Sequence, residues 1–131
     1  MNLDKFIGIP YVLGEDGYGG TDCLGLCRLF YYEHGWPQTF RDGKPIGHPS
    51  DPGQGIRLGR YFEKHFTRVE KEDLGYGDVI LFNIFGDPHC GLYVGDGNCL
   101  AMQVPCIEGS RSMVYHKRFW DKAFVAGYRR R

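Results

Sequence analysis

Two side chains in this sequence have the types and the placement that nucleophilic catalysis requires. Cys23 lies at the start of a predicted helix over residues 22–34, where free backbone N–H groups and the positive end of the helix dipole favour a thiolate. His89 opens a predicted strand, on which alternation puts it on one face with Gly91 and Tyr93. A histidine within hydrogen-bond reach of a cysteine can act as its general base, provided that a third group orients the ring. The pair therefore indicates acyl transfer, if the fold brings the two together.

The elements that must position this pair can be predicted from pattern and punctuation. Residues 8–20 are rich in glycine and should form a loop, and Thr21 or Asp22 can cap the helix that ends before Gly35. A long loop over 37–55 and a shorter helix over 56–65 follow. Apolar and branched runs then predict strands over residues 78–84, 89–94, 98–104, 112–115 and 124–128. Helices followed by strands indicate an α+β fold, with N-terminal helices packed on a C-terminal antiparallel sheet of about five strands.

Composition excludes several classes of function. The 131 residues, which we expect to form a single domain over 1–131, carry 16 basic and 16 acidic side chains, and a net charge of zero argues against nucleic acid as a partner. The first residues lack the pattern of a secretory signal, and no apolar run is long enough for membrane insertion, so we expect a soluble chain that is cytoplasmic on synthesis. The five cysteines are odd in number and lack a secretory context, which favours reduced thiols over disulfides. They include no Cys-x-x-Cys pair, so we predict neither a metal site nor a cofactor.

Five segments, in order along the chain, resemble the NlpC/P60 cysteine peptidases of papain-like fold. The second segment resembles the family's Gly-x-Asp-Cys-x-Gly-Leu nucleophile motif, and the fourth resembles its His-Val-Gly-Ile-Tyr-Val-Gly strand. Each segment alone is weakly specific, but five in the right order are strong. They are residues 8–14, 20–26, 77–82, 89–95 and 127–130.

The resemblance implies roles for individual residues. It makes Cys23 the nucleophile and His89 the general base, and it places Tyr11 at the oxyanion or substrate site. Asp22 falls where some members bind a substrate amine. The implied reaction is hydrolysis of peptidoglycan stem peptides through a thioester, commonly at the bond from D-γ-glutamyl to a diamino acid.

The third polar residue of the family departs from its pattern. By counting, its position falls at Ala101, which cannot orient an imidazole, and we expect Gln103 to replace it. A two-residue loop at Asp96-Gly97 turns Gln103 away from His89, whereas a three-residue loop with a bulge puts Gln103 on the His89 face. We predict the bulged loop.

Short chains of this kind that close on Tyr-Arg-Arg resemble the phage tail-associated branch, which implies association with a virion tail, tail proteins as partners and delivery to the cell wall. Two alternatives stay open. One is a catalytically silent module that binds wall peptide or assembles a tail. The other is a Cys–His acyltransferase or thioesterase, which needs an apolar groove such as Tyr31, Tyr32, Trp36 and Phe40 can supply.

Overall fold

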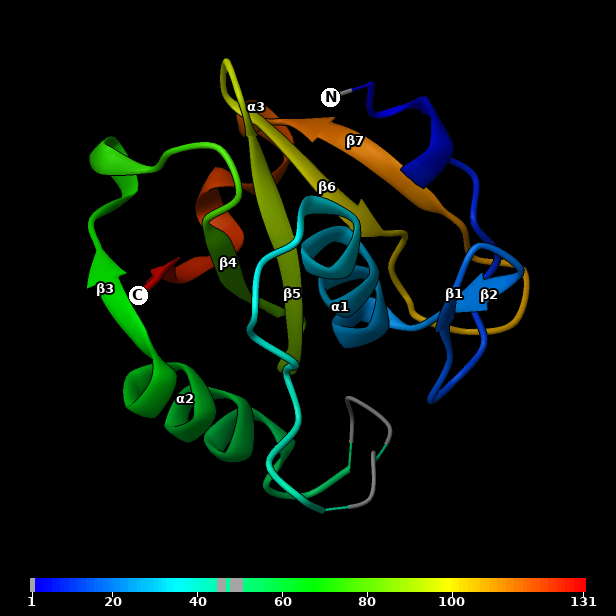
Figure 1. Cartoon of the computed structure of the whole chain (residues 1–131), viewed down its shortest axis with the longest axis horizontal. Helices are drawn as coiled ribbons and strands as arrows, with labels where there is room; N and C mark the ends of the chain where they lie inside the picture. The colour runs from blue at the N-terminus through cyan, green and yellow to red at the C-terminus, as the bar shows by residue number, and fades with distance from the viewer. Residues whose placement is uncertain (1, 45–46, 48–50) are drawn as a thin grey trace.

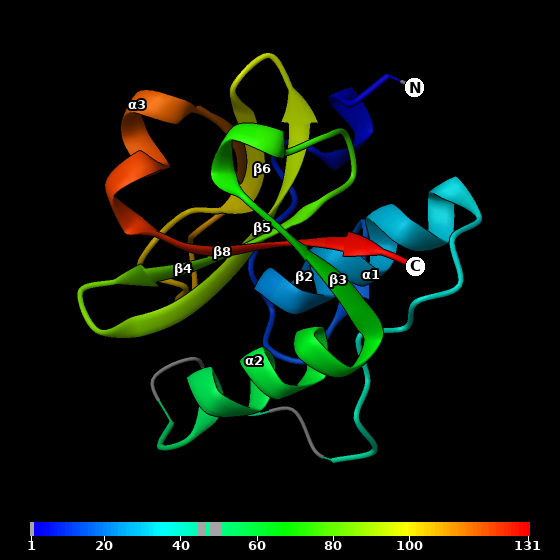
Figure 2. The ribbon, with the colours of Figure 1, turned by 90° about the vertical axis from the view of Figure 1, so that its left-hand side faces the viewer.

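The computed structural model describes residues 2–44, 47 and 51–131, and its centre is one antiparallel sheet with helices on both faces (Figure 1). In spatial order the sheet contains β3 (Phe66–Val69), β8 (Phe124–Arg130), β4 (Val79–Ile84), β5 (Asp87–Gly95), β6 (Asn98–Met102) and β7 (Ser112–His116). Helix α1 (Cys23–His34) covers one face, and α3 (Lys117–Trp120) lies on the other, as the turned view in Figure 2 shows. The predicted α+β architecture is confirmed.

Helix α1 forms where the capping signals predicted it. The Asp22 side chain accepts a hydrogen bond from the Gly25 backbone N–H, and Gly35 ends the helix in the left-handed conformation, with φ of 73°. Four apolar residues at helical spacing, Leu26, Cys27, Phe30 and Tyr31, are fully buried against the sheet. Helix α2 (Gln54–His65) begins two residues before its predicted start.

Several elements differ from the prediction. The sheet has six strands because β3, which follows α2 without a turn, pairs with β8; its four residues give too short a pattern to separate from the helix before it. The glycine-rich loop contains a short hairpin, β1 (Asp16–Gly17) with β2 (Gly20–Thr21), and α3 was not predicted. Three 3-10 turns complete the fold: η1 (Asp4–Phe6), η2 (Lys71–Asp73) and η3 (Asp121–Ala123). Of the predicted loop over 37–55, residues 45–46 and 48–50 lie outside the described residues.

The sheet separates two apolar cores, and this sets the direction of each strand side chain. Cys90 and Leu92 of β5 pack toward α1, as the alternation predicted. Ile80 and Phe82 of β4 pack with Trp120 on the opposite face. His89 pairs directly with Phe82 across the two strands, so its side chain starts from the face opposite α1. Within the described residues no helix has the length and apolarity needed to cross a membrane.

Close backbone packing at the first turn of α1 predicts a sharp response to one methyl group. A Cβ at Gly25 would lie 2.0 Å from the Glu15 carbonyl oxygen. We expect Gly25→Ala to lower the free energy of unfolding by about 1–3 kcal/mol or more, as overpacking does. Gly59 of α2, whose Cβ would meet nothing within 4 Å, is the control, and Gly59→Ala should stabilise by up to about 1 kcal/mol. Urea denaturation of both variants measures the difference, and equal stabilities would contradict the packing argument.

Candidate functional site

The nucleophile candidate is held in place by the carboxylate that precedes it. Asp22 is buried, with Oδ1 2.6 Å from the Gly25 nitrogen and Oδ2 2.8 Å from the Gly14 nitrogen. One side chain thereby joins the first turn of α1 to the loop before β1. The family resemblance implied that Asp22 binds a substrate amine. In the structure, each of its two oxygens accepts a hydrogen bond from a backbone N–H of the chain itself.

Cys23 occupies the start of α1 and is 5% exposed. Contact with the Cys90 thiol, and burial, raise the pKa of Cys23 well above its usual value of 9.0, and the neighbouring His89 opposes that rise only in part. The sequence analysis expected the helix terminus to favour a thiolate. That expectation is wrong for the free protein, because the apolar surroundings and a second thiol outweigh the helix terminus.

His89 is buried and held through both ring nitrogens. Nε2 lies 3.0 Å from the Met102 carbonyl oxygen. A carbonyl oxygen only accepts hydrogen bonds, so Nε2 carries the proton and donates. Nδ1 then carries no proton, so it is the basic atom of the ring. A backbone carbonyl on β6 thus orients the imidazole.

Gln103 does not reach His89. The Asp96-Gly97 turn has two residues rather than the predicted three, both with positive φ, and a bulge beyond it pairs Gly91 with Ala101. Position 103 therefore falls on the predicted His89 face through a different register, but β6 ends at Met102 and the Gln103 side chain turns to the next strand. There its Oε1 accepts from the Arg111 nitrogen at 2.9 Å, and its Nε2 lies 3.0 Å from the Met113 sulfur. The predicted contact with the imidazole is not made, since both ends of the amide are occupied.

A second thiol, Cys106, contacts the basic nitrogen of His89. Its Sγ lies 3.4 Å from Nδ1, and the Cys23 thiol is also close enough to the ring for His89 to lower its pKa. Burial, together with the nearby Cys23 and Asp22, raises the pKa of Cys106 to about 12, so the group facing Nδ1 is a neutral S–H. Sequence reasoning missed Cys106, because nothing in the spacing of residues 103–111 marks a loop that folds back over a strand.

Tyr11 brings an unpaired hydroxyl to the same place. Its backbone nitrogen donates to the Ser110 carbonyl at 2.8 Å, and its backbone bridges to Thr21 just before the helix. The hydroxyl oxygen is buried and has no hydrogen-bond partner among the described residues. Burial, with Cys106, Asp22 and Cys23 nearby, raises the pKa of Tyr11 to about 12. A neutral O–H donor therefore lies beside the two thiols with nothing to bind.

Two cavities meet at the imidazole. One, of about 510 Å³, and another, of about 320 Å³, are both lined by His89, Phe85 and Val104. Cys106 lines the smaller of the two. Cys23 lines a separate cavity of about 30 Å³ with Asp22 and Leu58.

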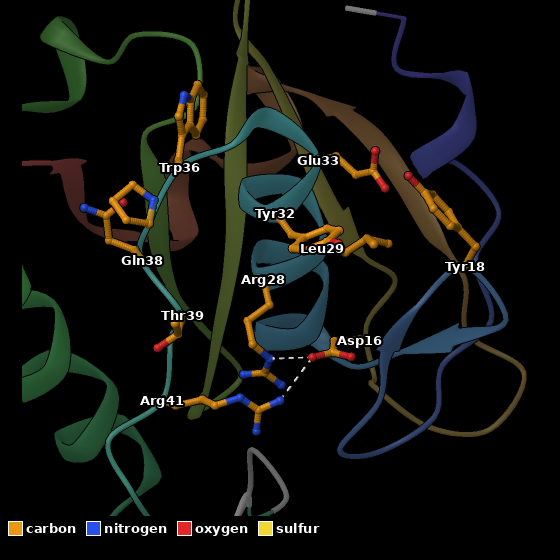
Figure 3. A pocket seen from close by; sticks show the side chains of 11 residues that line it. Asp16, Tyr18, Arg28, Leu29, Tyr32, Glu33, Trp36, Gln38, Thr39 and Arg41 are labelled. Atoms are coloured by element: carbon orange, nitrogen blue, oxygen red, sulfur yellow. Dashed lines mark hydrogen bonds and ion pairs between the residues drawn. The ribbon is translucent and has the colours of Figure 1, made fainter.

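A further cavity, of about 570 Å³, lies on the outer side of α1, away from Cys23 and His89 (Figure 3). Figure 3 shows Arg28 and Arg41 both reaching Asp16, at 3.0 and 3.1 Å. Tyr32 and Trp36 line it. Of the four aromatic residues expected to supply a groove, Tyr31 and Phe40 are instead buried in the core.

The donor groups of the site do not form a metal centre. All five cysteines are free thiols. Over residues 2–44, 47 and 51–131, no three His, Cys, Asp or Glu side chains are grouped so that they could hold an ion.

Two known proteins are similar to this chain in sequence. A dipeptidyl-peptidase from Bacillus cereus, named for gamma-D-glutamyl-L-lysine, is 33% identical over 106 residues, which cover 76% of this chain and 26% of that protein. A probable endopeptidase from Haemophilus influenzae is 28% identical over 123 residues, covering 92% of this chain and 65% of that protein. The chain thus spans only part of each relative.

The fold also has close counterparts among solved structures. The NlpC/p60 domain of the peptidoglycan hydrolase SagA superposes with a TM-score of 0.61 over 95% of this chain and 89% of that chain, at 23% identity. The sequence model of the NlpC/P60 family matches residues 8–129, which include Tyr11, Cys23 and His89. This chain therefore belongs to the NlpC/P60 family.

Proposed function

We propose that this chain is a cysteine peptidase that hydrolyses peptidoglycan stem peptides at the bond from D-γ-glutamyl to a diamino acid. The observation that carries the proposal is the state of His89. Its Nε2 donates to the Met102 carbonyl, which leaves Nδ1 unprotonated and basic; Nδ1 contacts the Cys106 thiol in the free protein and lies in the vicinity of the Cys23 thiol. One relative, the Bacillus cereus dipeptidyl-peptidase named for gamma-D-glutamyl-L-lysine, supports the choice of bond.

The proposed reaction starts from a protonated thiol. Because its pKa is raised, Cys23 holds its proton until substrate is bound, and His89 then accepts that proton on Nδ1 while the sulfur attacks the substrate carbonyl carbon. The imidazolium gives the proton to the leaving amine as the C–N bond breaks, which leaves a thioester on Cys23. Water, deprotonated by the same nitrogen, then cleaves the thioester and restores the thiol.

Two donors are placed to stabilise the negative charge that develops on the substrate oxygen. One is the backbone N–H of Cys23 at the helix start, where it lacks a partner within the helix. The other is the Tyr11 hydroxyl, which is buried and unpaired in the free protein. Because the Tyr11 hydroxyl breaks no existing hydrogen bond when it binds the substrate oxygen, it is suited to stabilise a charge that exists only in the transition state.

Other residues of the predicted site act through position in this proposal. Gln103 and Arg111 exchange hydrogen bonds at 2.9 Å, which closes the loop that carries Cys106. The Cys106 thiol must move away from Nδ1 of His89 during the reaction. Because this thiol is neutral, its movement leaves no buried charge unpaired. The binding of a substrate amine by Asp22, and association with phage tail proteins, stay predictions from the resemblance.

Removing each thiol in turn tests which one is the nucleophile. Purified peptidoglycan is digested with wild type, Cys23→Ala and Cys106→Ala, and the products are identified by mass spectrometry. We expect Cys23→Ala to lose activity more than about a thousandfold, as nucleophile deletions do, and Cys106→Ala to keep most of it. Fragments from Cys23→Ala would refute the assignment. No fragments from folded wild type would favour the silent binding module or a non-wall acyl substrate.

The unpaired hydroxyl of Tyr11 predicts that activity and stability separate. Tyr11→Phe should lower kcat about a hundredfold, as the loss of one oxyanion donor does. The same change should leave the free energy of unfolding equal or higher, since a buried hydroxyl without a partner destabilises. Steady-state kinetics and urea denaturation on the same preparation give both values. An unchanged kcat would show that Tyr11 has no part in the reaction.

The raised pKa of Cys23 predicts the pH dependence of its alkylation. A thiol is the main form below its pKa, so the reactive thiolate fraction of Cys23 grows about tenfold per pH unit across the neutral range. The rate of iodoacetamide modification, followed by peptide mass spectrometry, should rise in the same way and not level off below pH 9. His89→Ala removes the group that lowers this pKa and should slow the reaction further. A rate that is constant near neutral pH would mean that Cys23 is already a thiolate.

A further inference from the structure

An apolar groove lies beside His89 and is separate from the small cavity at Cys23. We call the cavity of about 510 Å³ the His89 groove; its apolar wall consists of Phe82, Ile84, Phe85, Val104, Phe119 and Trp120. These residues come from β4 and its turn, from the segment just after β6 and from α3. The groove therefore opens on the face of the sheet that packs against α3, and it reaches the imidazole from that side.

Three apolar side chains at the rim of the groove are exposed to solvent rather than packed into the core. Phe119 is 67% exposed and Val104 is 44% exposed, while Phe85 is exposed in full. Scattered exposed apolar side chains are ordinary, but several around one concave site indicate a surface that binds something.

The chemistry at His89 says which part of a substrate reaches this groove. In amide hydrolysis the acyl carbon becomes bonded to Cys23, and the amine departs with a proton from His89. Cys23 is absent from the groove lining, and His89 is part of it. The groove therefore lies on the side of the leaving amine, where it meets the side chain of the amino acid whose α-nitrogen is released.

The charge of the groove selects the form of that side chain. Its lining includes Lys122 and no carboxylate. Lys122 repels a free ammonium at the end of a diamino acid side chain, and the apolar wall does not solvate one. An acylated amine is neutral and pays neither cost.

We propose that the His89 groove binds the side chain of the leaving diamino residue with its distal amine acylated, as in a cross-linked stem peptide. The enzyme then prefers cross-linked wall peptides over free stems. This inference rests on the proposed peptidase function and adds the state of the substrate to it.

A matched pair of substrates tests the preference. They are L-alanyl-γ-D-glutamyl-L-lysine with a free ε-amine and the same peptide with that amine acetylated. We expect kcat/KM to be about fivefold higher for the acetylated peptide, which is the upper range for one exposed charge. Equal values, or a preference for the free amine, would overturn the proposal.

Three variants assign the preference to the groove. Lys122→Glu should reverse it, because the rim then attracts the free ammonium. Phe119→Asp should lower kcat/KM for the acetylated peptide and leave the free peptide nearly unchanged. Tyr32→Asp, an equally exposed aromatic position in the cavity on the outer side of α1, is the matched control and should change neither. A Lys122→Glu variant with the preference of the wild type would contradict the role of charge.

Binding without turnover separates this inference from the proposed reaction. The chain has two tryptophans. Trp120 lines the groove, and Trp36 lies elsewhere, under the Arg130 guanidinium. In Cys23→Ala, the acetylated peptide should shift the indole N–H resonance of Trp120 and leave that of Trp36 in place. Such a shift, with no cleavage by wild type, would keep the groove and reject the hydrolysis. Cleavage of both peptides at one rate without a Trp120 shift would reject the groove alone.

Discussion

The Asp22 carboxylate is the interaction on which the site depends. Its two oxygens fix the first turn of α1 and the loop before β1 through two backbone N–H groups. Cys23 is the next residue, so the hydrogen bonds of Asp22 also fix the backbone from which its sulfur projects. A carboxylate with 3% exposure is costly to bury unless it is hydrogen-bonded. The hydrogen bonds of Asp22 both satisfy the carboxylate and hold the two backbone segments in place. Gly25 completes the arrangement, because any larger residue would push the loop at Glu15 away.

The sheet solves the remaining problem, which is to bring a base from one face to a nucleophile on the other. His89 lies near the start of β5, at the end of the sheet where α1 also begins, and Cys90 beside it points into the core against Cys23. Strand alternation alone would separate the histidine from the cysteine. Placement near the start of strand β5, with the loop over 103–111 folded across the ring, brings them to one site.

Sequence reasoning gave the parts that follow local rules. The cap at Asp22 and the stop at Gly35 each depend on a few adjacent residues, and both were found; the turn at Asp96-Gly97 was found in place, but its length is two residues and not the predicted three. It did not give the group that orients His89, because a backbone carbonyl at Met102 leaves no mark in the residue types. Gln103 was a reasonable choice by register, but strand β6 ends one residue before it. The pKa of Cys23 was misjudged for a related reason, since Cys90 approaches it from a strand 67 positions away along the chain.

Ser112 ties the first segment of the chain to strand β7. Its hydroxyl accepts from the Ile9 nitrogen at 2.9 Å and donates to the Phe6 carbonyl, across more than a hundred positions. Tyr11 lies two residues after Ile9, and so takes its place only when β7 is in place. Contacts of such separation form slowly, because the closure of long loops must precede them. The complete site is therefore a property of the fully folded chain, and a partly folded one holds its thiols without the donor that would make them useful.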